Sequence, residues 1–254
     1  MREAGHAERV QQQFGEQAAA YLSSVVHAQG EEFAQLRDAV AAQAGAKVLD
    51  LGCGAGHVSF QVAERAGQVV AYDLSALMLQ VVADEAARRG LLNVDTRQGA
   101  AERLPFADAE FDFVFSRYSA HHWSDVPLAL REVRRVLKPG GRAAFIDIAS
   151  PGAPLLDTHL QAVEVLRDTS HVRNYSHAEW HAMLAAASLH AERSQRLRLR
   201  LEFSSWVERM RTPQLMQQAI RVLQQSMGRE VRDYFDIGDD GSFSSDVLVL
   251  WATA

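Results

Sequence analysis

A short apolar run that ends in a cluster of glycines constrains this chain more than any other feature. Residues 47–51 (KVLDL) lead at once into the turn 52–56 (GCGAG), and a helical pattern follows from residue 57. Glycines let a ligand approach the backbone closely, and the start of a helix offers free N–H groups to an anionic group. The order of strand, glycine turn and helix therefore predicts a ligand site at the end of a buried strand.

The chain continues to residue 148 as an alternation of strands and helices. Strands are expected over 69–72, 93–98, 111–116 and 142–148, and helices over 57–64, 75–89 and 126–137. This alternation is typical of βαβ units with right-handed crossovers. We therefore expect an α/β fold, with a doubly wound, mostly parallel sheet and helices on both faces.

Both ends of the chain differ from this middle part. The first 44 residues lack strand signals, and we expect two helices there, the second over about 31–42. After the break at 150–154 (SPGAP) the pattern becomes less regular. Helices are expected up to about Arg167, over 178–187, and over 205–227 with an interruption at Pro213, and strands over 196–203 and 244–253.

Composition restricts the class of protein and of partner. The chain has 254 residues, of which 48% are hydrophobic and 23% charged, as in ordinary globular domains. Its net charge of −6 argues against non-specific attraction to nucleic acid or to an anionic membrane. A single cysteine excludes an internal disulfide. With no apolar leader at the start and no run of about 18 uncharged apolar residues, we expect a cytoplasmic protein without membrane insertion.

An acidic residue complements the glycine turn. Asp73 ends the second predicted strand, 17 residues after Gly56. A carboxylate at this position can accept hydrogen bonds from both hydroxyls of a ribose, so the two features together predict a nucleoside cofactor. The glycines are spaced G-x-G-x-G, whereas the dinucleotide-binding pattern is G-x-G-x-x-G, which disfavours a dinucleotide.

The segment VLDLGCGAG resembles the first motif of class I S-adenosylmethionine-dependent methyltransferases. Four further segments match this superfamily in order: AYDLSALML, GAAERLPF, FDFVFSRYSAHHW and REVRRVLKPGGR. Together they cover about residues 47–148 and resemble the ubiquinone/menaquinone C-methyltransferase-like branch. The resemblance implies S-adenosyl-L-methionine as the cofactor. It also implies a Rossmann-like methyltransferase fold with seven strands, the last of them antiparallel, and it says much less about the methyl acceptor.

The resemblance also implies roles for individual residues. The methionine end of the donor would be contacted by Asp50, Gly52, Gly54 and Gly56, and its ribose by Asp73. The adenine would be contacted by Leu74, Met78, Ala101 and Glu102. Ser116 and Arg117 would lie under the sulfonium. One departure is Ala100, where the family often has an Asp that binds the adenine amino group. That contact is therefore expected to be made otherwise or to be missing.

Three residues in this part of the chain also have plain structural interpretations. Asp50 can pin the glycine turn by accepting local N–H groups, a role that does not exclude contact with the donor. Cys53 is expected to be a small packed residue rather than a nucleophile. Met78 shares a helical spacing with Val81 and Val82, so it suits the core as well as a cofactor wall.

The candidate catalytic residues lie where the transferable methyl group should be. His121 and His122 follow the fourth predicted strand, and either can act as a general base because imidazole titrates near neutral pH. A purely structural role for both is the alternative. Tyr21, in the N-terminal segment, is a third candidate. No further residues with metal-ligand spacing accompany the histidines, so we expect no metal.

The methyl acceptor should be held outside the common core. We expect an N-terminal helical lid over 1–44, a cofactor-binding core over 45–150, and substrate-side insertions with the last strands over 151–254. The aromatic residues and arginines of the lid and of the insertions suit a small, partly planar or acidic molecule rather than nucleic acid. We expect this molecule to be methylated on carbon or oxygen. Two alternatives remain: a donor-binding protein without methyl transfer, and a nicotinamide-dependent oxidoreductase. The oligomeric state is left open.

Overall fold

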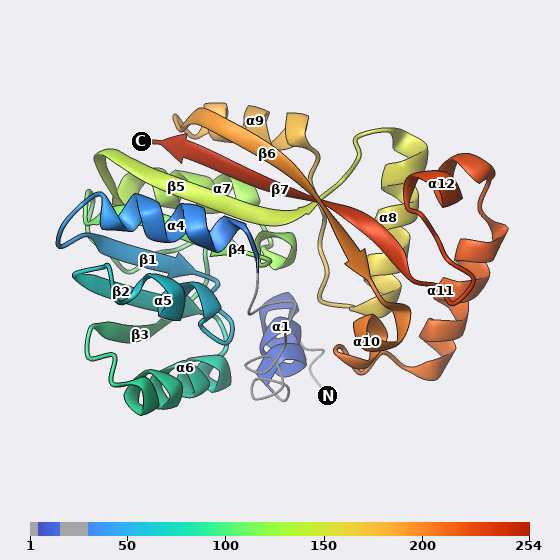
Figure 1. The fold of residues 1–254 in the computed structure, drawn as a ribbon, viewed down its shortest axis with the longest axis horizontal. Coiled ribbons are helices and arrows are strands. Elements are labelled where there is room, and N and C mark those ends of the chain that lie inside the picture. Colours follow the sequence, from blue (N-terminus) through green and yellow to red (C-terminus); the bar gives the residue numbers. More distant parts are fainter. Residues whose placement is uncertain (1–4, 16–29) are drawn as a thin grey trace.

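A computed structural model describes residues 5–15 and 30–254 of the chain. The described residues form a seven-stranded sheet in the order β3-β2-β1-β4-β5-β7-β6 (Figure 1). The strands are β1 Lys47–Leu51, β2 Gln68–Asp73, β3 Val94–Gln98, β4 Phe111–Arg117, β5 Leu137–Ala149, β6 His190–Leu201 and β7 Phe243–Thr253. Neighbours among β1 to β5 pair in parallel, and β7 is antiparallel to both β5 and β6. The predicted sheet, with its last strand antiparallel, is confirmed.

Helices cover both faces of this sheet. They are α1 His6–Gly15, α4 Glu32–Ala41, α5 His57–Val62, α6 Ala76–Arg89, the 3₁₀ turn η1 Ala120–His122, α7 Val126–Val136, α8 Pro154–Arg167, α9 His177–Ala186, α10 Phe203–Glu208, α11 Gln214–Ser226 and α12 Arg229–Tyr234. Buried residues of α4, with Val58 and Val62 of α5, belong to one hydrophobic cluster, whereas those of α7 and α9 belong to another. The two clusters are the two faces predicted for a doubly wound sheet.

Side-chain alternation along the strands explains why both faces are apolar. In β4, Phe113 and Phe115 pack into the cluster under α4 and α5, while Val114 between them packs into the cluster under α7. Successive residues of a strand point to opposite faces. Every residue of β4 is therefore buried, which accounts for the continuous apolar run FDFVFS in the sequence.

Three segments differ from the sequence-based prediction. The sixth strand begins at His190 rather than at residue 196, because it pairs with β7 from that point onward. Strand β5 already begins at Leu137 rather than at residue 142, and it includes residues 138–141 (KPGG), where Gly140 has a φ of +75°. The short helix α12 was not expected, since Val231 is its only buried residue and gives no periodic pattern.

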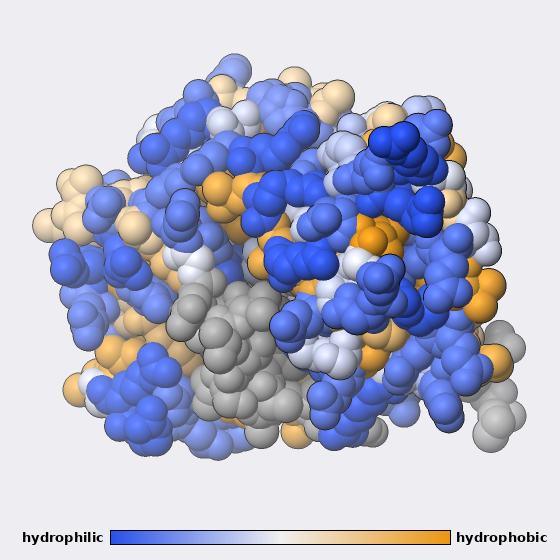
Figure 2. Space-filling view, turned by 45° about the vertical axis from the view of Figure 1, so that its right-hand side comes forward, coloured by the Kyte–Doolittle hydropathy of each residue, from blue (hydrophilic) through white to orange (hydrophobic). Residues whose placement is uncertain are grey.

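The carboxyl ends of the parallel strands face helix α1. Figure 1 shows α1 between this edge of the sheet and a group of helices formed by α8, α10, α11 and α12. The face turned forward in Figure 2 is mostly hydrophilic, with apolar residues in small separate groups. Within the described ranges, no helix is both long enough and apolar enough to cross a membrane.

Candidate active site

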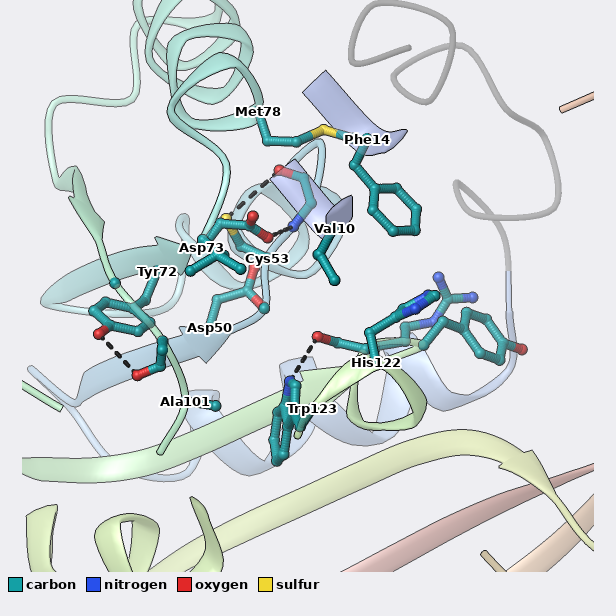
Figure 3. Close-up of a pocket in the computed structure, with 18 of the residues that line it drawn as sticks. Val10, Phe14, Asp50, Cys53, Tyr72, Asp73, Met78, Ala101, His122 and Trp123 are labelled. Carbon is teal, nitrogen blue, oxygen red and sulfur yellow. Dashed lines mark hydrogen bonds between the residues drawn. The ribbon is translucent and has the colours of Figure 1, made fainter. Parts of the chain in front are cut away.

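A large cavity opens where strands β1 and β2 end. It encloses about 1110 Å³, counted to its open mouth. Helix α1 forms part of its wall with His6, Val10 and Phe14. Figure 3 shows Asp50 and Asp73 on one side of this space, and Phe14 and His122 on the other. A concave site of this size, outside the carboxyl ends of parallel strands, is where doubly wound folds bind their ligands.

The three glycines of the turn have different structural roles. All have positive φ angles: +70° at Gly52, +51° at Gly54 and +84° at Gly56. A Cβ atom on Gly54 would meet nothing within 4 Å, so this backbone is open to the cavity. A Cβ on Gly52 would collide with Ser119 Oγ. Gly56 is the N-cap of α5 and does not line the cavity, so it shapes the turn from behind.

Asp50 both pins the turn and lines the cavity. Its Oδ2 accepts hydrogen bonds from the backbone N–H of Ser59 at 2.9 Å and from Ser59 Oγ at 2.6 Å. Burial raises the pKa of Asp50 to about 7, because desolvation outweighs those two hydrogen bonds. The structural role considered from the sequence is therefore present, and it is compatible with contact to a ligand.

Asp73 is held by the backbone on both of its oxygens. Oδ2 accepts from the N–H of Gly54 at 2.9 Å, and Oδ1 accepts from the N–H of Ser75 at 2.8 Å. Burial raises the pKa of this carboxyl, although the backbone hydrogen bonds oppose that shift. The glycine turn and the acidic residue predicted to complement it are thus joined directly and lie together in the cavity wall.

The predicted adenine end is formed by Leu74, Met78, Ala101 and Glu102, which all line the cavity. Met78 is 1% exposed and packs against Ala55, so it belongs to the core and to the wall at once. Glu102 Oε1 accepts from the backbone N–H groups of Ser124 and Asp125 and so holds the loop that leads into α7.

Sequence reasoning missed Tyr72, which orders the segment at this end of the cavity. Its hydroxyl lies 3.1 Å from the carbonyl oxygen of Ala100 and 3.2 Å from that of Arg103. A Cβ atom on Gly99 would collide with that hydroxyl, so glycine is required there. The only signal in the sequence was an aromatic residue directly before Asp73.

Ser116 and Arg117 lie in different environments. Ser116 is buried behind the cavity wall, and its Oγ has no hydrogen-bond partner among the described residues. Arg117 lines the cavity and pairs with Glu32 of α4 at 2.7 Å, with its guanidinium 4.5 Å from the ring centroids of Phe33 and Tyr118. Glu32 was not singled out from the sequence, since only the fold brings α4 to the end of β4.

Cys53 lies in the cavity wall as a packed residue. Its side chain is buried with Phe60 and Leu79, and burial raises the pKa of its thiol well above the usual value. A protonated, buried thiol is a poor nucleophile. This environment is the one expected for a structural cysteine.

A second cavity adjoins the first. It encloses about 600 Å³, counted to its opening, and shares the residues Phe14, Tyr118 and His122 with the first cavity. Its apolar wall includes Leu199 and Leu201 of β6. Its polar wall comes from η1, from α8 and the loop after it, and from the residue that follows α10: His121, His122, Glu164, Arg167, Asp168, Asn174 and Arg209.

His121 lies in this second cavity, paired with Asp147 of β5. Its Nδ1 is 2.6 Å from Asp147 Oδ1, and its backbone N–H donates to Asp147 Oδ2 at 3.2 Å. Burial alone lowers the pKa of His121. The charge and hydrogen bond of Asp147, with the charges of Glu164 and Asp168, outweigh burial and raise the pKa above 6.5. Because Nδ1–H donates to the carboxylate, Nε2 is the basic nitrogen.

His122 has the opposite character. Its Nδ1 donates to the carbonyl oxygen of Ser170 at 3.0 Å, and its ring meets the edge of Phe14 with centroids 4.8 Å apart. Burial and the charge of His121 lower the pKa of His122 to about 3, so its ring is neutral near pH 7. Tyr21, the third candidate, lies outside the described residues. Among those residues, no three His, Cys, Asp or Glu side chains gather as metal ligands would.

Comparison with known proteins identifies the family. A model described as a methyltransferase domain matches residues 49–145. The uncharacterized methyltransferase YcgJ of Bacillus subtilis (strain 168) is 37% identical over 224 residues, which are 88% of each protein. Its crystal structure matches with a TM-score of 0.84 and 34% identity, over 87% of this chain and 97% of that one.

Two further relatives extend this result. The uncharacterized protein YafE of Escherichia coli (strain K12) is 56% identical over 195 residues, 77% of this chain and 94% of YafE. The 2-phytyl-1,4-naphtoquinone methyltransferase of Synechococcus elongatus is 42% identical over 120 residues, 46% of this chain and 52% of that protein.

This chain belongs to the class I S-adenosylmethionine-dependent methyltransferases, and S-adenosyl-L-methionine is its methyl donor. Family membership decides against the nicotinamide-dependent oxidoreductase considered from the sequence. The first cavity fits this donor in its chemistry. It combines an open backbone at Gly54, a fixed carboxylate at Asp73 for ribose hydroxyls, and an apolar wall that includes Leu74 and Met78.

Proposed function

We propose that this enzyme transfers a methyl group to a carbon or oxygen atom of a small molecule bound in the second cavity. The observation that carries this proposal is the wall of Phe14, Tyr118 and His122, which the two cavities share. An acceptor bound in the second cavity would lie next to the donor where the two cavities adjoin, and neither ligand would have to leave its own site. Methyl transfer depends mainly on such alignment of the two reactants.

On the donor side, the bound cofactor supplies a methyl group attached to a positively charged sulfur. Asp73 accepts hydrogen bonds from its ribose hydroxyls. Asp50 and the turn containing Gly52, Gly54 and Gly56 hold the methionine end. Leu74, Met78, Ala101 and Glu102 surround the adenine, and Ser116 and Arg117 support the wall beneath the sulfonium.

On the acceptor side, His121 is the proposed general base. Its Nε2 would take the proton from an acceptor hydroxyl or from an activated C–H group. Asp147 stabilises the imidazolium that forms, as the carboxylate does in other His–Asp pairs. His122 remains neutral and shapes the shared wall.

The terminal parts of the chain are proposed to select the acceptor. The lid expected over residues 1–44 includes α1, which contributes Phe14 to both cavities. Residues 151–254 supply Leu199, Leu201 and Trp206 to the second cavity. This apolar part of the wall suits a small, partly planar acceptor, and the net charge of −6 disfavours nucleic acid. Quinones, which the Synechococcus relative's name mentions, have this shape.

The test is a turnover assay with purified enzyme and S-adenosylmethionine. The acceptors are neutral hydroxyarenes such as 1,4-dihydroxynaphthalene, compared with mixed tRNA and with an unfractionated protein pool. We expect S-adenosylhomocysteine to form only with small molecules, and NMR of the product to place the new methyl group on carbon or oxygen. Methylation of tRNA or protein instead would refute the proposal. Donor binding without turnover of any acceptor would support the alternative of a binding protein.

A further inference from the structure

Asn174 is a buried amide side chain in the second cavity that makes no hydrogen bond within the described protein. It is 1% exposed, and neither Nδ2 nor Oδ1 has a partner among the described residues. It lines the cavity in the loop between α8 and α9. Buried polar groups in native proteins are nearly always paired, so an amide with both ends free calls for an explanation.

The backbone of Asn174 is fixed by a single residue of α8. Gln161 Oε1 accepts from the N–H of Asn174 at 3.0 Å, and Gln161 Nε2 donates to its carbonyl oxygen at 2.7 Å. Asn side chains in loops commonly bond to neighbouring backbone groups and stabilise the turn. Here Gln161 performs that task, and the side chain of Asn174 remains available to a ligand.

The charged groups beside Asn174 already have partners. Arg167 Nη1 lies 3.5 Å from Glu164, and its Nε donates to the carbonyl oxygen of Trp206 at 3.0 Å. Asp168 accepts from the N–H and hydroxyl of Ser170. Two carboxylates, Glu164 and Asp168, and two guanidinium groups, Arg167 and Arg209, line the same cavity, so its charges are balanced. The free amide therefore favours a neutral ligand.

The loop also ties Asn174 to the proposed base. The N–H groups of Val172 and Arg173 both donate to the carbonyl oxygen of His121, at 2.8 and 3.3 Å. The position of the amide relative to the histidine is thus set by the backbone. A ligand bound by the amide would be held at a defined position relative to His121.

We propose that Asn174 recognises the methyl acceptor by pairing its amide with a neutral edge that carries a carbonyl beside a hydroxyl. Nδ2 donates to the carbonyl oxygen, and Oδ1 accepts from the hydroxyl. This inference rests on the proposed function of the second cavity. It assigns the specificity for the acceptor to one residue and names the chemical class that the residue selects.

The first test compares two neutral fused-ring probes, 2-hydroxy-1-tetralone and 1-tetralone, by calorimetry in the presence of saturating S-adenosylhomocysteine. We expect the wild-type protein to bind the hydroxy ketone at least about tenfold more tightly, because the other ketone leaves Oδ1 unpaired. In Asn174→Leu this preference should disappear, while the affinity for S-adenosylhomocysteine stays unchanged.

Two results would overturn the assignment of Asn174. One is that wild type and Asn174→Leu prefer the hydroxy ketone over the ketone to the same degree. The other is that the wild type binds neither probe while it binds S-adenosylhomocysteine normally. A wild-type protein that does not bind S-adenosylhomocysteine would contradict the donor site itself. The turnover assay described above separates failure of this inference from failure of the proposed function, because turnover of small molecules by a protein without this preference would refute only the role of Asn174.

A second test needs no ligand. If the amide is unpaired in the free protein, Asn174→Leu removes two unsatisfied groups and should raise the melting temperature. Asn93→Leu is the matched control, because Asn93 Nδ2 donates to the carbonyl oxygens of Ala63 and Ala66 at 2.8 and 3.0 Å. That variant should melt at a lower temperature. A lower melting temperature for Asn174→Leu as well would mean that the amide has a partner in the free fold, against the proposal.

Discussion

The two cavities of this enzyme are built in different ways. The donor cavity is formed mainly by backbone and side chains between Asp50 and Ser124, within one stretch of βαβ structure. The second cavity, the proposed acceptor cavity, draws its residues from α1, η1, β5, α8 and the loop after it, β6 and α10, which lie far apart in the sequence. Binding of a cofactor common to a family can be encoded locally, whereas binding of a particular acceptor depends on how distant segments pack.

The buried titratable groups of the two regions also differ. On the donor side they are carboxylates whose pKa burial raises, to about 7 for Asp50. Beside the second cavity, burial lowers the pKa of His122 to about 3 and that of His171 to about 2, whereas Asp147 keeps the pKa of His121 raised. In both cases desolvation favours the neutral form.

The strongest test of the donor half is Asp73→Ala. Its carboxylate would lose hydrogen bonds to two ribose hydroxyls, each worth about 1.5–3 kcal/mol for a charged acceptor. We expect calorimetry to show S-adenosylhomocysteine binding weakened by about a hundredfold or more. Asp84→Ala, on the exposed side of α6, should bind normally. An Asp73→Ala protein that is folded and keeps its affinity would break the assignment of the donor site.

Because Asp73 also accepts from Gly54 and Ser75, alanine disturbs the turn as well. Asp73→Asn keeps the shape of the side chain and one acceptor oxygen. It should fall between wild type and alanine in affinity. Circular dichroism on both variants distinguishes lost contacts from a lost fold.

On the acceptor side, His121→Gln should reduce kcat by about a hundredfold or more, since a positioned general base contributes at least that much. Affinity for S-adenosylhomocysteine should not change. His122→Gln should have a smaller effect on kcat, because the low pKa of His122 makes it a weak base. Equal losses in the two variants would contradict the distinction drawn between the histidines.

The pairing of His121 with Asp147 should also give proton removal by His121 a characteristic dependence on pH. The base must be neutral, and Asp147 raises the pKa of His121 despite burial. Activity should therefore increase with pH through a pKa above 6.5. In Asp147→Asn that ascending limb should move to lower pH, and an NMR titration of the His121 ring should move with it. An unchanged limb would mean that another group limits the rate.

What could be predicted from the sequence follows the same division. The glycine turn, Asp73 and the parallel strands were all predicted, because each rests on local spacing or on period-two burial. Of the implied donor residues, Gly56 and Ser116 do not line the cavity. Sequence position placed them near the donor, but the direction of a residue within a turn or strand decides whether it faces a ligand.

The acceptor half was predicted only in outline. His121 and His122 were singled out as a pair, but the difference between them comes from Asp147 and Ser170, which lie 26 and 48 residues away. Neither Asn174 nor Gln161 was singled out from the sequence, since a polar residue in a loop or on a helix is ordinary. Their roles become visible only when α8 and its following loop are folded against η1.

A smaller effect concerns stability on the acceptor side. His159 of α8 is 3% exposed, its Nδ1 has no partner among the described residues, and its pKa is about 4. The folded pKa is lower than the unfolded value of about 6.5. The contribution of His159 to the free energy of unfolding is therefore fully present above pH 6.5 and is lost as the pH falls towards 4. At pH 5, His159→Leu should remove an acid destabilisation of about 1–2 kcal/mol, measured by urea unfolding at pH 5 and pH 7.5. If the substitution changed the free energy of unfolding equally at both pH values, protonation of His159 would not be the cause.

The finest test concerns Asp50 and returns to the donor side. Its pKa of about 7 in the free protein means that below this pH a bound cation must displace a proton. S-adenosylmethionine is cationic, so its binding favours the carboxylate. Its affinity should rise with pH between about 5.5 and 7, by at most tenfold per unit, or about 1.4 kcal/mol. Asp50→Asn should bind with a flat profile in this range, whereas Asp84→Asn should keep the slope.

Calorimetry in two buffers of different ionisation enthalpy measures the displaced proton directly. Near pH 6.5 the wild-type protein should release a fraction of a proton on binding S-adenosylmethionine, and Asp50→Asn should release less. Proton release that is equal in the two proteins would mean that Asp50 only pins the turn through Ser59. The donor cavity would then recognise its ligand through the backbone and Asp73, and its contrast with the side-chain-built acceptor cavity would be sharper still.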